Sequence, residues 1–324
     1  MEIILLVLGG QGLFLFAVSS LSETLRSILG ERTKDILQKC TGNLFTAILT
    51  GLIATIILDS SSAVIILAIV MINAKVLTFR QALGIVMGAN TGTTFSSQLI
   101  AFDIGKFSPI PIFLGLILTI ISRSEKISQT AKVLLYFGIL FFGLYTMERA
   151  VEPLRDDVRF NGWMQALESP WKGAVTGAVV TLIIQSSSAT VGMVITLAKK
   201  GLITLGASLA VMLGAELGTC ADTLLATIKS NRQALKTGLF HLLFNLTSIL
   251  IGLMLFPLFL KMVQWISAHA SLERMVANGH MLFNIIGTIV FIPLIPAVEN
   301  WLNKVLPDKP EAVKDEQLAV SSTV

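Results

Sequence analysis

A serine triplet occurs twice in this chain, each time inside an apolar run. The first copy reads Asp59-Ser60-Ser61-Ser62-Ala63, and the second, Gln185-Ser186-Ser187-Ser188-Ala189, follows 126 positions later. Each buried hydroxyl must find a hydrogen-bond partner or remain solvated. Two such triplets at one offset predict a duplicated site.

The same offset relates other parts of the chain. Thr50-Gly51 matches Thr176-Gly177, and the run GANTGTT at 88–94 matches GAELGTC at 214–220 without a gap. Apolar composition alone would not produce one register over this length, so we predict two copies of one unit, residues 3–125 and 129–250. The predicted organisation is repeat 1 at 1–125, repeat 2 at 126–260, an additional C-terminal transmembrane helix at 261–304 and a polar, disordered tail at 305–324.

Composition places the chain in a lipid bilayer. Of its 324 residues, 54% are hydrophobic and 14% are charged, and the mean hydropathy is +0.80. Its apolar runs are long enough for membrane spans. The 24 basic residues are scattered between these runs, so we do not expect a nucleic-acid partner. Cys40 and Cys220 have no metal-site or disulfide spacing.

The serine triplets interrupt apolar segments, and the piece after the first triplet, 63–73, is too short to cross a membrane. Residues 41–58 and 63–73 flank the first triplet, and residues 172–198 surround the second. Each region predicts a re-entrant hairpin with its polar tip inside the membrane. The glycine motifs lie near the middle of 77–101 and 202–227 and predict interrupted helices packed against the tips.

Three crossings per unit would insert the second copy upside down. The predicted fold is therefore an all-α polytopic membrane protein with two inverted-topology repeats, re-entrant helical hairpins and broken transmembrane helices, as in many secondary transporters. Counting Lys and Arg in the loops predicts a multi-pass protein of the cell inner membrane, with the N-terminus outside and the C-terminus in the cytoplasm. Lys199-Lys200 lies on the opposite side in this scheme.

The triplets contain groups that bind both anions and cations. Backbone amides at helix N-termini and serine hydroxyls can hold an oxyanion, while freed carbonyls and the same hydroxyl oxygens can coordinate Na⁺. Serines can also serve only to join helices by hydrogen bonds. Two matched triplets at hairpin tips favour a binding site.

The paired motifs resemble those of the type II sodium/phosphate cotransporters and their bacterial relatives. The segments HLLFN at 241–245 and ANGHMLFN at 277–284 also look like the HxxFN segments of the bacterial members. The resemblance implies Na⁺-driven symport of inorganic phosphate by alternating access, without catalysis and without a cofactor beyond Na⁺. It implies substrate-binding residues Ser60, Ser61, Ser62, Asn90, Thr93, Ser186, Ser187, Ser188 and Thr219. It implies cation-binding residues Gln185, Ser186, Ser187 and Thr219.

Two positions depart from the family pattern. Asp59 stands where the first motif usually has Gln, and Glu216 stands where the second glycine motif usually has Asn. A carboxylate at the membrane centre costs roughly 2.5–3.5 kcal/mol on insertion scales, which makes it a functional candidate. We hypothesise that Asp59 and Glu216 take over part of the cation site, with altered Na⁺ stoichiometry or H⁺ coupling. The alternatives are a neutral acid that replaces the amide, and a substrate other than phosphate.

Other functions remain to be weighed against transport. An intramembrane serine hydrolase needs a base beside its nucleophile, and neither triplet has a nearby His or Lys in sequence. A channel or a ligand sensor could use the same site. For His241 and His280 we favour structural hydrogen bonds between helices. The pairs Gly84/Gly88 and Gly173/Gly177 could pack within one chain or between two, so an oligomer is allowed.

Overall fold

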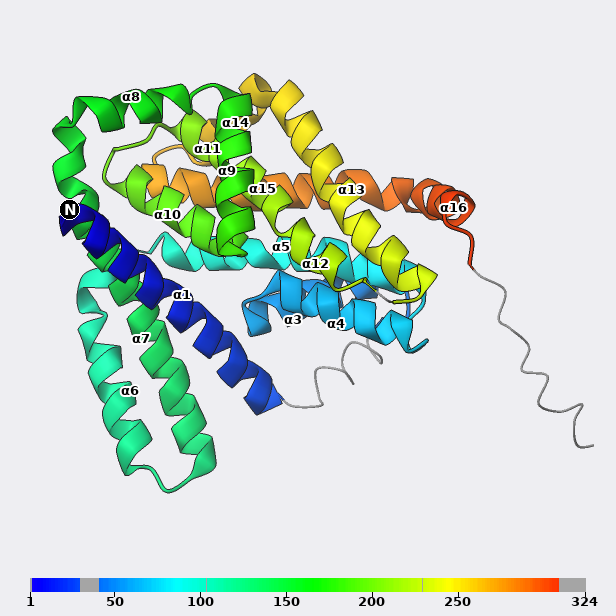
Figure 1. The fold of residues 1–324 in the computed structure, drawn as a ribbon, viewed down its shortest axis with the longest axis horizontal. Coiled ribbons are helices and arrows are strands. Elements are labelled where there is room, and N and C mark those ends of the chain that lie inside the picture. Colours follow the sequence, from blue (N-terminus) through cyan, green and yellow to red (C-terminus); the bar gives the residue numbers. More distant parts are fainter. Residues whose placement is uncertain (1, 30–40, 103, 229, 309–324) are drawn as a thin grey trace, which may run out of the picture.

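The computed structural model describes residues 2–29, 41–102, 104–228 and 230–308. Within these ranges the chain is almost entirely helical and contains no strand (Figure 1). Five helical segments are long and apolar enough to cross a membrane: Glu2–Leu25, Glu125–Asp156, Leu205–Leu225, Arg232–Met254 and Leu272–Val305. A bent pair, Phe79–Ile100 with Gly105–Ile121, could form a sixth span. The all-α polytopic membrane class is confirmed, while the tail beyond residue 308 lies outside the described residues.

The described helices divide between the two halves of the chain. The first half contains α1 (Glu2–Leu29), α3 (Leu44–Leu58), α4 (Ser61–Asn73), α5 (Phe79–Ile100) and α6 (Pro109–Ile121). The second half contains α7 (Glu125–Val151), α8 (Val158–Ala166), α9 (Pro170–Ile184), α10 (Ser187–Lys199), α11 (Leu205–Gly218), α12 (Cys220–Leu225) and α13 (Arg232–Met254). The chain continues through α14 (Phe256–Ile266), α15 (Leu272–Phe291) and α16 (Ile295–Val305).

Each serine triplet joins two short helices, as predicted. Helices α3 and α9 have 15 residues each, and α4 and α10 have 13. At 1.5 Å per residue they are about 20–22 Å long, shorter than a hydrocarbon core of about 30 Å. Neither arm of either hairpin could cross a bilayer alone.

Glycines hold α3 against α5 and α9 against α11 with the same contacts. A Cβ atom added at Gly51 would lie 2.3 Å from the Ile85 carbonyl oxygen, and one added at Gly177 would lie 1.9 Å from that of Val211. Both glycines and both partners are related by the 126-residue offset. The two halves therefore share packing as well as sequence, because only a residue without a side chain allows this approach.

The prediction that both glycine motifs break their helices is wrong for the first one. Helix α5 runs without interruption through 88–94. Its Gly88 and Gly92 contact the backbone of α3, so the glycines serve close packing there and leave the helix intact. In the second half, Thr219 separates α11 from α12, as predicted for an interrupted helix.

Helices α1 and α7, the first helices of the two halves, pack antiparallel. Gly10 of α1 contacts Gly143 and Met147 in the second half of α7, whereas Glu23 near the end of α1 lines a cavity with Gln129 and Lys132 near the start of α7. Helix α6 packs against α7, and the two project from the rest of the bundle in Figure 1. Opposite insertion of the two repeats predicts this antiparallel pairing.

Candidate functional site

A residue in the left-handed conformation turns the chain at each hairpin tip. Asp59 has φ 50° and ψ 33°, and Gln185 has φ 59° and ψ 29°. Non-glycine residues adopt this region infrequently, and such residues cluster at ligand-binding sites. The following serines, Ser60 and Ser186, accept hydrogen bonds from the amides of Ala63 and Ala189, each at 3.2 Å. Each triplet therefore caps the N-terminus of the second hairpin helix.

The two tips meet in one cavity of about 600 Å³. At about 30 Å³ per water molecule, this volume accommodates an oxyanion together with cations and water. The first tip contributes Asp59, Ser60, Ser61 and Ser62, and the second contributes Ile184, Gln185, Ser186, Ser187 and Ser188. Thr219, at the break between α11 and α12, also lines the cavity. Residues 126 positions apart in sequence thus face the same space.

Helix ends and hydroxyls give this cavity its chemistry. The N-termini of α4 and α10 both lie at the wall, and helix N-termini favour negative charge. The described lining nevertheless contains two carboxylates, Asp59 and Glu23, and no Lys, Arg or His. A multiply charged oxyanion in this cavity would therefore need cations or protons beside it.

Helix α1 forms a wall of the cavity that we did not predict. Its lining residues are Leu15, Val18, Ser19, Ser22 and Glu23. The three polar residues follow the spacing i, i+3 and i+4, which places them on one helical face. This spacing was the sequence signal that could have pointed to a polar face on α1. At the 126-residue offset these positions are Tyr145, Glu148 and Arg149, so no residue type is repeated and the comparison of the repeats did not reveal the wall.

Asp59 contacts α5 as well as the cavity. The hydroxyl of Ser96 on α5 donates a hydrogen bond to the Asp59 carboxylate. A smaller, mainly apolar cavity of about 160 Å³ on the α5 side also includes both residues in its lining. Asp59 therefore connects the hairpin tip to the long helix that packs behind it.

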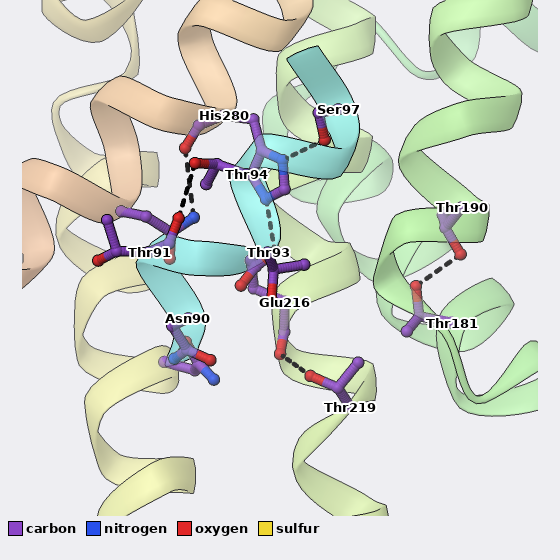
Figure 2. Close-up of polar contacts among 12 residues, drawn as sticks. Asn90, Thr91, Thr93, Thr94, Ser97, Thr181, Thr190, Glu216, Thr219 and His280 are labelled. Atoms are coloured by element: carbon purple, nitrogen blue, oxygen red, sulfur yellow. Dashed lines mark hydrogen bonds and ion pairs between the residues drawn. The ribbon is translucent and has the colours of Figure 1, made fainter. Parts of the chain in front are cut away.

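Three predicted site residues lie outside the described cavity lining. The Asn90 side-chain amide donates a hydrogen bond to the side-chain amide oxygen of Asn245 at 2.9 Å. The Thr93 hydroxyl donates to the backbone carbonyl of Ala89 at 3.1 Å. Glu216 is buried, and its Oε1 atom lies 2.7 Å from the Nε2 atom of His280. Figure 2 shows Glu216 between His280 and Thr219. The Thr219 hydroxyl donates to the backbone carbonyl oxygen of Glu216.

Each of the two buried histidines contacts both repeats, and the repeat that faces Nε2 in one histidine faces Nδ1 in the other. His241 on α13 contacts Asn90 of the first repeat through Nε2 and Thr223 of the second through Nδ1, at 3.2 and 2.7 Å. His280 on α15 contacts Glu216 of the second repeat through Nε2 and Ser97 of the first through Nδ1, at 2.7 and 2.6 Å. The 126-residue offset relates Asn90 to Glu216 and Ser97 to Thr223. The expectation that both histidines hydrogen-bond between helices is confirmed.

A larger cavity lies away from the serine triplets. It measures about 1150 Å³ and lies between the α4–α5 connection, the start of α13 and α16. Lys75, Arg232, Glu299 and Asp308 line it with residues of both charges. It contains none of the motif residues, so we assign the candidate site to the smaller serine-lined cavity, where the two repeats converge.

Comparisons with known proteins match both halves of the chain to one family. The Na⁺/Pi-cotransporter family profile matches residues 13–149 and again residues 156–289. YqeW of Bacillus subtilis strain 168 is 26% identical over 301 residues, which cover 91% of this chain and 96% of YqeW. No solved structure matches the chain.

Two further relatives have names that refer to phosphate. YjbB of Escherichia coli K12, named for inorganic phosphate export, is 26% identical over 289 residues, 88% of this chain and 52% of YjbB. The chain therefore spans about half the length of that relative. Mouse sodium-dependent phosphate transport protein 2A is 25% identical over 143 residues, 40% of this chain and 22% of that protein. From the two family matches, which together cover most of its length, the chain belongs to the Na⁺/Pi-cotransporter family.

Proposed function

We propose that this protein is a secondary active transporter that moves inorganic phosphate together with Na⁺ by alternating access through the serine-lined cavity. The observation that carries the proposal is the convergence of two capped helix N-termini and both serine triplets on one space. Helix N-termini and hydroxyls suit a phosphate oxyanion, and hydroxyl and amide oxygens suit Na⁺. The phosphate-related names of YjbB and of transport protein 2A support the choice of substrate.

Cation coupling follows from the charge of the cavity. Asp59 and Glu23 would repel a bound phosphate, so cations beside them would lower the cost of bringing the anion in. Asp59, Gln185 and the hydroxyls of Ser186, Ser187 and Thr219 offer oxygen ligands to Na⁺ on the same wall. Loading of phosphate would thereby depend on prior or simultaneous loading of Na⁺.

The proposal includes insertion in the cell inner membrane, with the N-terminus outside and the C-terminus in the cytoplasm. Lys199 and Lys200, the basic pair on the opposite side in this scheme, both form ion pairs with Glu148. The Glu148 carboxylate accepts a hydrogen bond from Lys199 at 2.6 Å and lies 3.1 Å from the Lys200 ammonium. Glu23 also lines a second polar cavity of about 230 Å³ between α1 and α7. In this orientation that cavity lies on the cytoplasmic side of the serine-lined cavity, and Glu23 lines both.

The second candidate is a proton- or sodium-coupled carrier of a different small substrate, with Asp59 and Glu216 in the cation site. The observation that favours it is the presence of two carboxylates at the cavity, which can carry protons as well as bind Na⁺. A serine hydrolase is disfavoured because the described cavity lining holds no His or Lys, and His241 and His280 are hydrogen-bonded elsewhere.

Uptake of radiolabelled phosphate into proteoliposomes tests the proposal. An inward Na⁺ gradient should drive uptake, whereas a matched K⁺ gradient should not. Phosphate uptake driven by an inward H⁺ gradient without Na⁺ would replace Na⁺ coupling with proton coupling. No phosphate uptake under either gradient would reject phosphate transport by this chain, and gradient-driven uptake of labelled sulfate or arsenate instead would support the second candidate.

A further inference from the structure

Helices α1 and α7 touch closely at one end and enclose a cavity at the other. A Cβ atom added at Gly10 would lie 2.8 Å from the Gly143 carbonyl oxygen, and one added at Gly143 would lie 2.7 Å from that of Gly10. Further along α1, the Phe16 ring packs edge-on against Tyr136 of α7, with 6.0 Å between the ring centroids. Beyond this contact lies the polar cavity of about 230 Å³ that shares Glu23 with the serine-lined cavity. We call this cavity the vestibule.

The walls of the vestibule are two polar helical faces. On α1 the lining residues are Ser20, Glu23, Thr24 and Ser27. On α7 they are Gln129, Lys132 and Tyr136. The first set follows the spacing i, i+3, i+4 and i+7, and the second follows i, i+3 and i+7, so each set lies on one face of its helix. The vestibule is therefore polar on both sides.

The two polar faces do not bond to each other. The Thr24 hydroxyl donates to the Ser20 carbonyl at 2.7 Å, which is a contact within α1. Among the described contacts, no hydrogen bond or ion pair joins the α1 lining to the α7 lining, and none involves the Lys132 ammonium. Polar side chains that only hold membrane helices together bond across the interface. Polar faces that a cavity separates suit a polar ligand and water instead.

Lys132 supplies the positive charge that the serine-lined cavity lacks. It is the only basic residue in the described linings of the two cavities, whereas Asp59 and Glu23 line the serine-lined cavity. Because Glu23 lines both cavities, an anion that moves between them passes this carboxylate and is repelled by it. The Lys132 ammonium offsets that repulsion from the opposite wall. Lysine binds phosphate as a point charge, so the vestibule is suited to an oxyanion.

We propose that the vestibule is a second binding site for inorganic phosphate, in which Lys132 holds the anion before or after it occupies the serine-lined cavity. Gln129 and Tyr136, on the same face of α7, add an amide and a hydroxyl as hydrogen-bond donors. The volume equals that of roughly seven water molecules, which leaves room for a tetrahedral oxyanion with part of its hydration shell. The choice of phosphate rests on the proposed function.

The vestibule site should differ from the serine-lined cavity in its ion dependence. Lys132 provides a fixed positive charge, so binding in the vestibule does not require Na⁺. The site is polar and open to water on two walls, and one of its own residues, Glu23, repels the ligand. Its affinity for phosphate should therefore be weaker than that of the serine-lined cavity in Na⁺, and it should fall as ionic strength rises.

Phosphorus nuclear magnetic resonance of inorganic phosphate tests this binding with the purified full chain in a phosphorus-free detergent. In choline buffer, S187A should still broaden the ³¹P line, because this substitution affects only the serine-lined cavity. Removal of one charge about 4 Å from an anion in water should weaken binding about fivefold in S187A/K132Q. S187A/K132R, which keeps the charge, should broaden the line like S187A. The matched control is S187A/K126Q, which removes an exposed lysine of α7 that lies outside the lining.

Glu23 gives a prediction of opposite sign in the same experiment. S187A/E23Q should bind phosphate more tightly than S187A in choline, because it removes the repulsion. Equal broadening in S187A and S187A/K132Q, or no broadening by S187A in choline, would overturn the vestibule site. This result does not depend on transport.

Transport tests whether the vestibule lies on the substrate path. K132Q should raise the half-saturating phosphate concentration about fivefold on the vestibule side of the membrane, which the proposed orientation makes the cytoplasmic side. The half-saturating concentration on the opposite side should stay unchanged, and K126Q should change neither. Equal values in K132Q and the wild type on both sides would remove the vestibule from the path. Absence of wild-type transport would instead reject the proposed function, and the ³¹P result would then decide the vestibule site alone.

Discussion

Ser96 on α5 donates a hydrogen bond to the carboxylate of Asp59 at the tip of the first hairpin. The contact joins a cavity-lining residue to a helix outside the hairpin, across 37 positions of sequence. At the second tip, the counterpart of Asp59 is Gln185, which is neutral. The two tips are therefore equivalent in backbone conformation and different in charge.

Replacing Asp59 with Gln should make the first tip resemble the second and weaken cation binding. Loss of a charged ligand is expected to cost on the order of 1.5–3 kcal/mol, so the apparent Na⁺ affinity in uptake assays should fall at least about tenfold. S96A is the matched control, because it removes the hydrogen bond and keeps the charge. It should have a smaller effect on Na⁺ affinity than D59Q. Unchanged Na⁺ dependence in D59Q would exclude Asp59 from the cation site.

Glu23 should contribute to the same electrostatic environment from α1. A unit charge about 4 Å from a cation in water contributes about 1 kcal/mol, so E23Q should lower the apparent Na⁺ affinity about fivefold. The control is E2Q, which removes an exposed carboxylate from the first turn of the same helix. Equal Na⁺ affinities in E23Q and E2Q would show that α1 does not take part in cation binding.

The close contacts of Gly88 and Gly214 should be essential for folding. A Cβ atom at these positions would lie 1.9 Å from the Ile48 carbonyl oxygen and 1.7 Å from that of Ala174. G88A and G214A must separate α5 from α3 and α11 from α9, at a cost of about 3 kcal/mol or more. Both variants should lose their monodisperse peak in size-exclusion chromatography.

Gly206 provides the matched control for these alanine substitutions. It also lies in α11, and nothing lies within 4 Å of a Cβ atom placed there. G206A should therefore remain folded and gain a little from the better helix propensity of alanine. If G214A behaved like G206A, the close packing of α9 and α11 would be incorrect.

A hydroxyl pair in the second hairpin has no equivalent in the first. Thr181 donates to Thr190 at 2.7 Å, joining α9 to α10, as Figure 2 shows. The residues 126 positions earlier are Thr55 and Val64. Valine has no hydroxyl, and the buried Thr55 hydroxyl has no hydrogen-bond partner among the described residues. T190V should lower the free energy of unfolding by about 1–3 kcal/mol, because it leaves the Thr181 hydroxyl unpaired.

The reverse substitution should act in the opposite direction. V64T supplies a partner for Thr55 and should raise stability by up to about 1 kcal/mol. The measurement is the apparent unfolding temperature of the two purified variants and the wild type in one detergent. A T190V variant as stable as the wild type would contradict the contribution of this hydroxyl pair.

Sequence reasoning predicted the parts of the site that the duplication marks. The hairpins and their polar tips followed from two matched motifs and from the length that a membrane span requires. The resemblance to the cotransporter family implied Gln185 and Thr219, and Asp59 was singled out as a departure from the family pattern. The wall formed by α1 was missed because Ser19, Ser22 and Glu23 carry no repeated motif. Their spacing marks one polar face of α1 but does not show that this face meets a cavity.

The remaining differences arose from tertiary contacts. Glycines in 88–94 suggested a break, but α3 packs against them and α5 stays continuous. The pairing of Glu216 with His280 joins residues 64 positions apart, on helices whose approach no local pattern encodes. The equivalence of His241 and His280 emerged only from their contacts, because the two residues do not obey the 126-residue offset.

Equilibrium binding of radiolabelled phosphate to the purified full chain is the most direct test of the serine-lined cavity. Ser187 lines that cavity, whereas Ser208 is a buried serine whose hydroxyl donates to the Thr204 carbonyl at 2.8 Å, outside the lining. Phosphate should bind in Na⁺ and bind at least about tenfold more weakly in choline. S187A should lose at least about tenfold in affinity, as expected for a hydrogen bond to a charged ligand, while S208A should bind like the wild type. Wild-type affinity in S187A, or equal binding with and without Na⁺, would contradict the account.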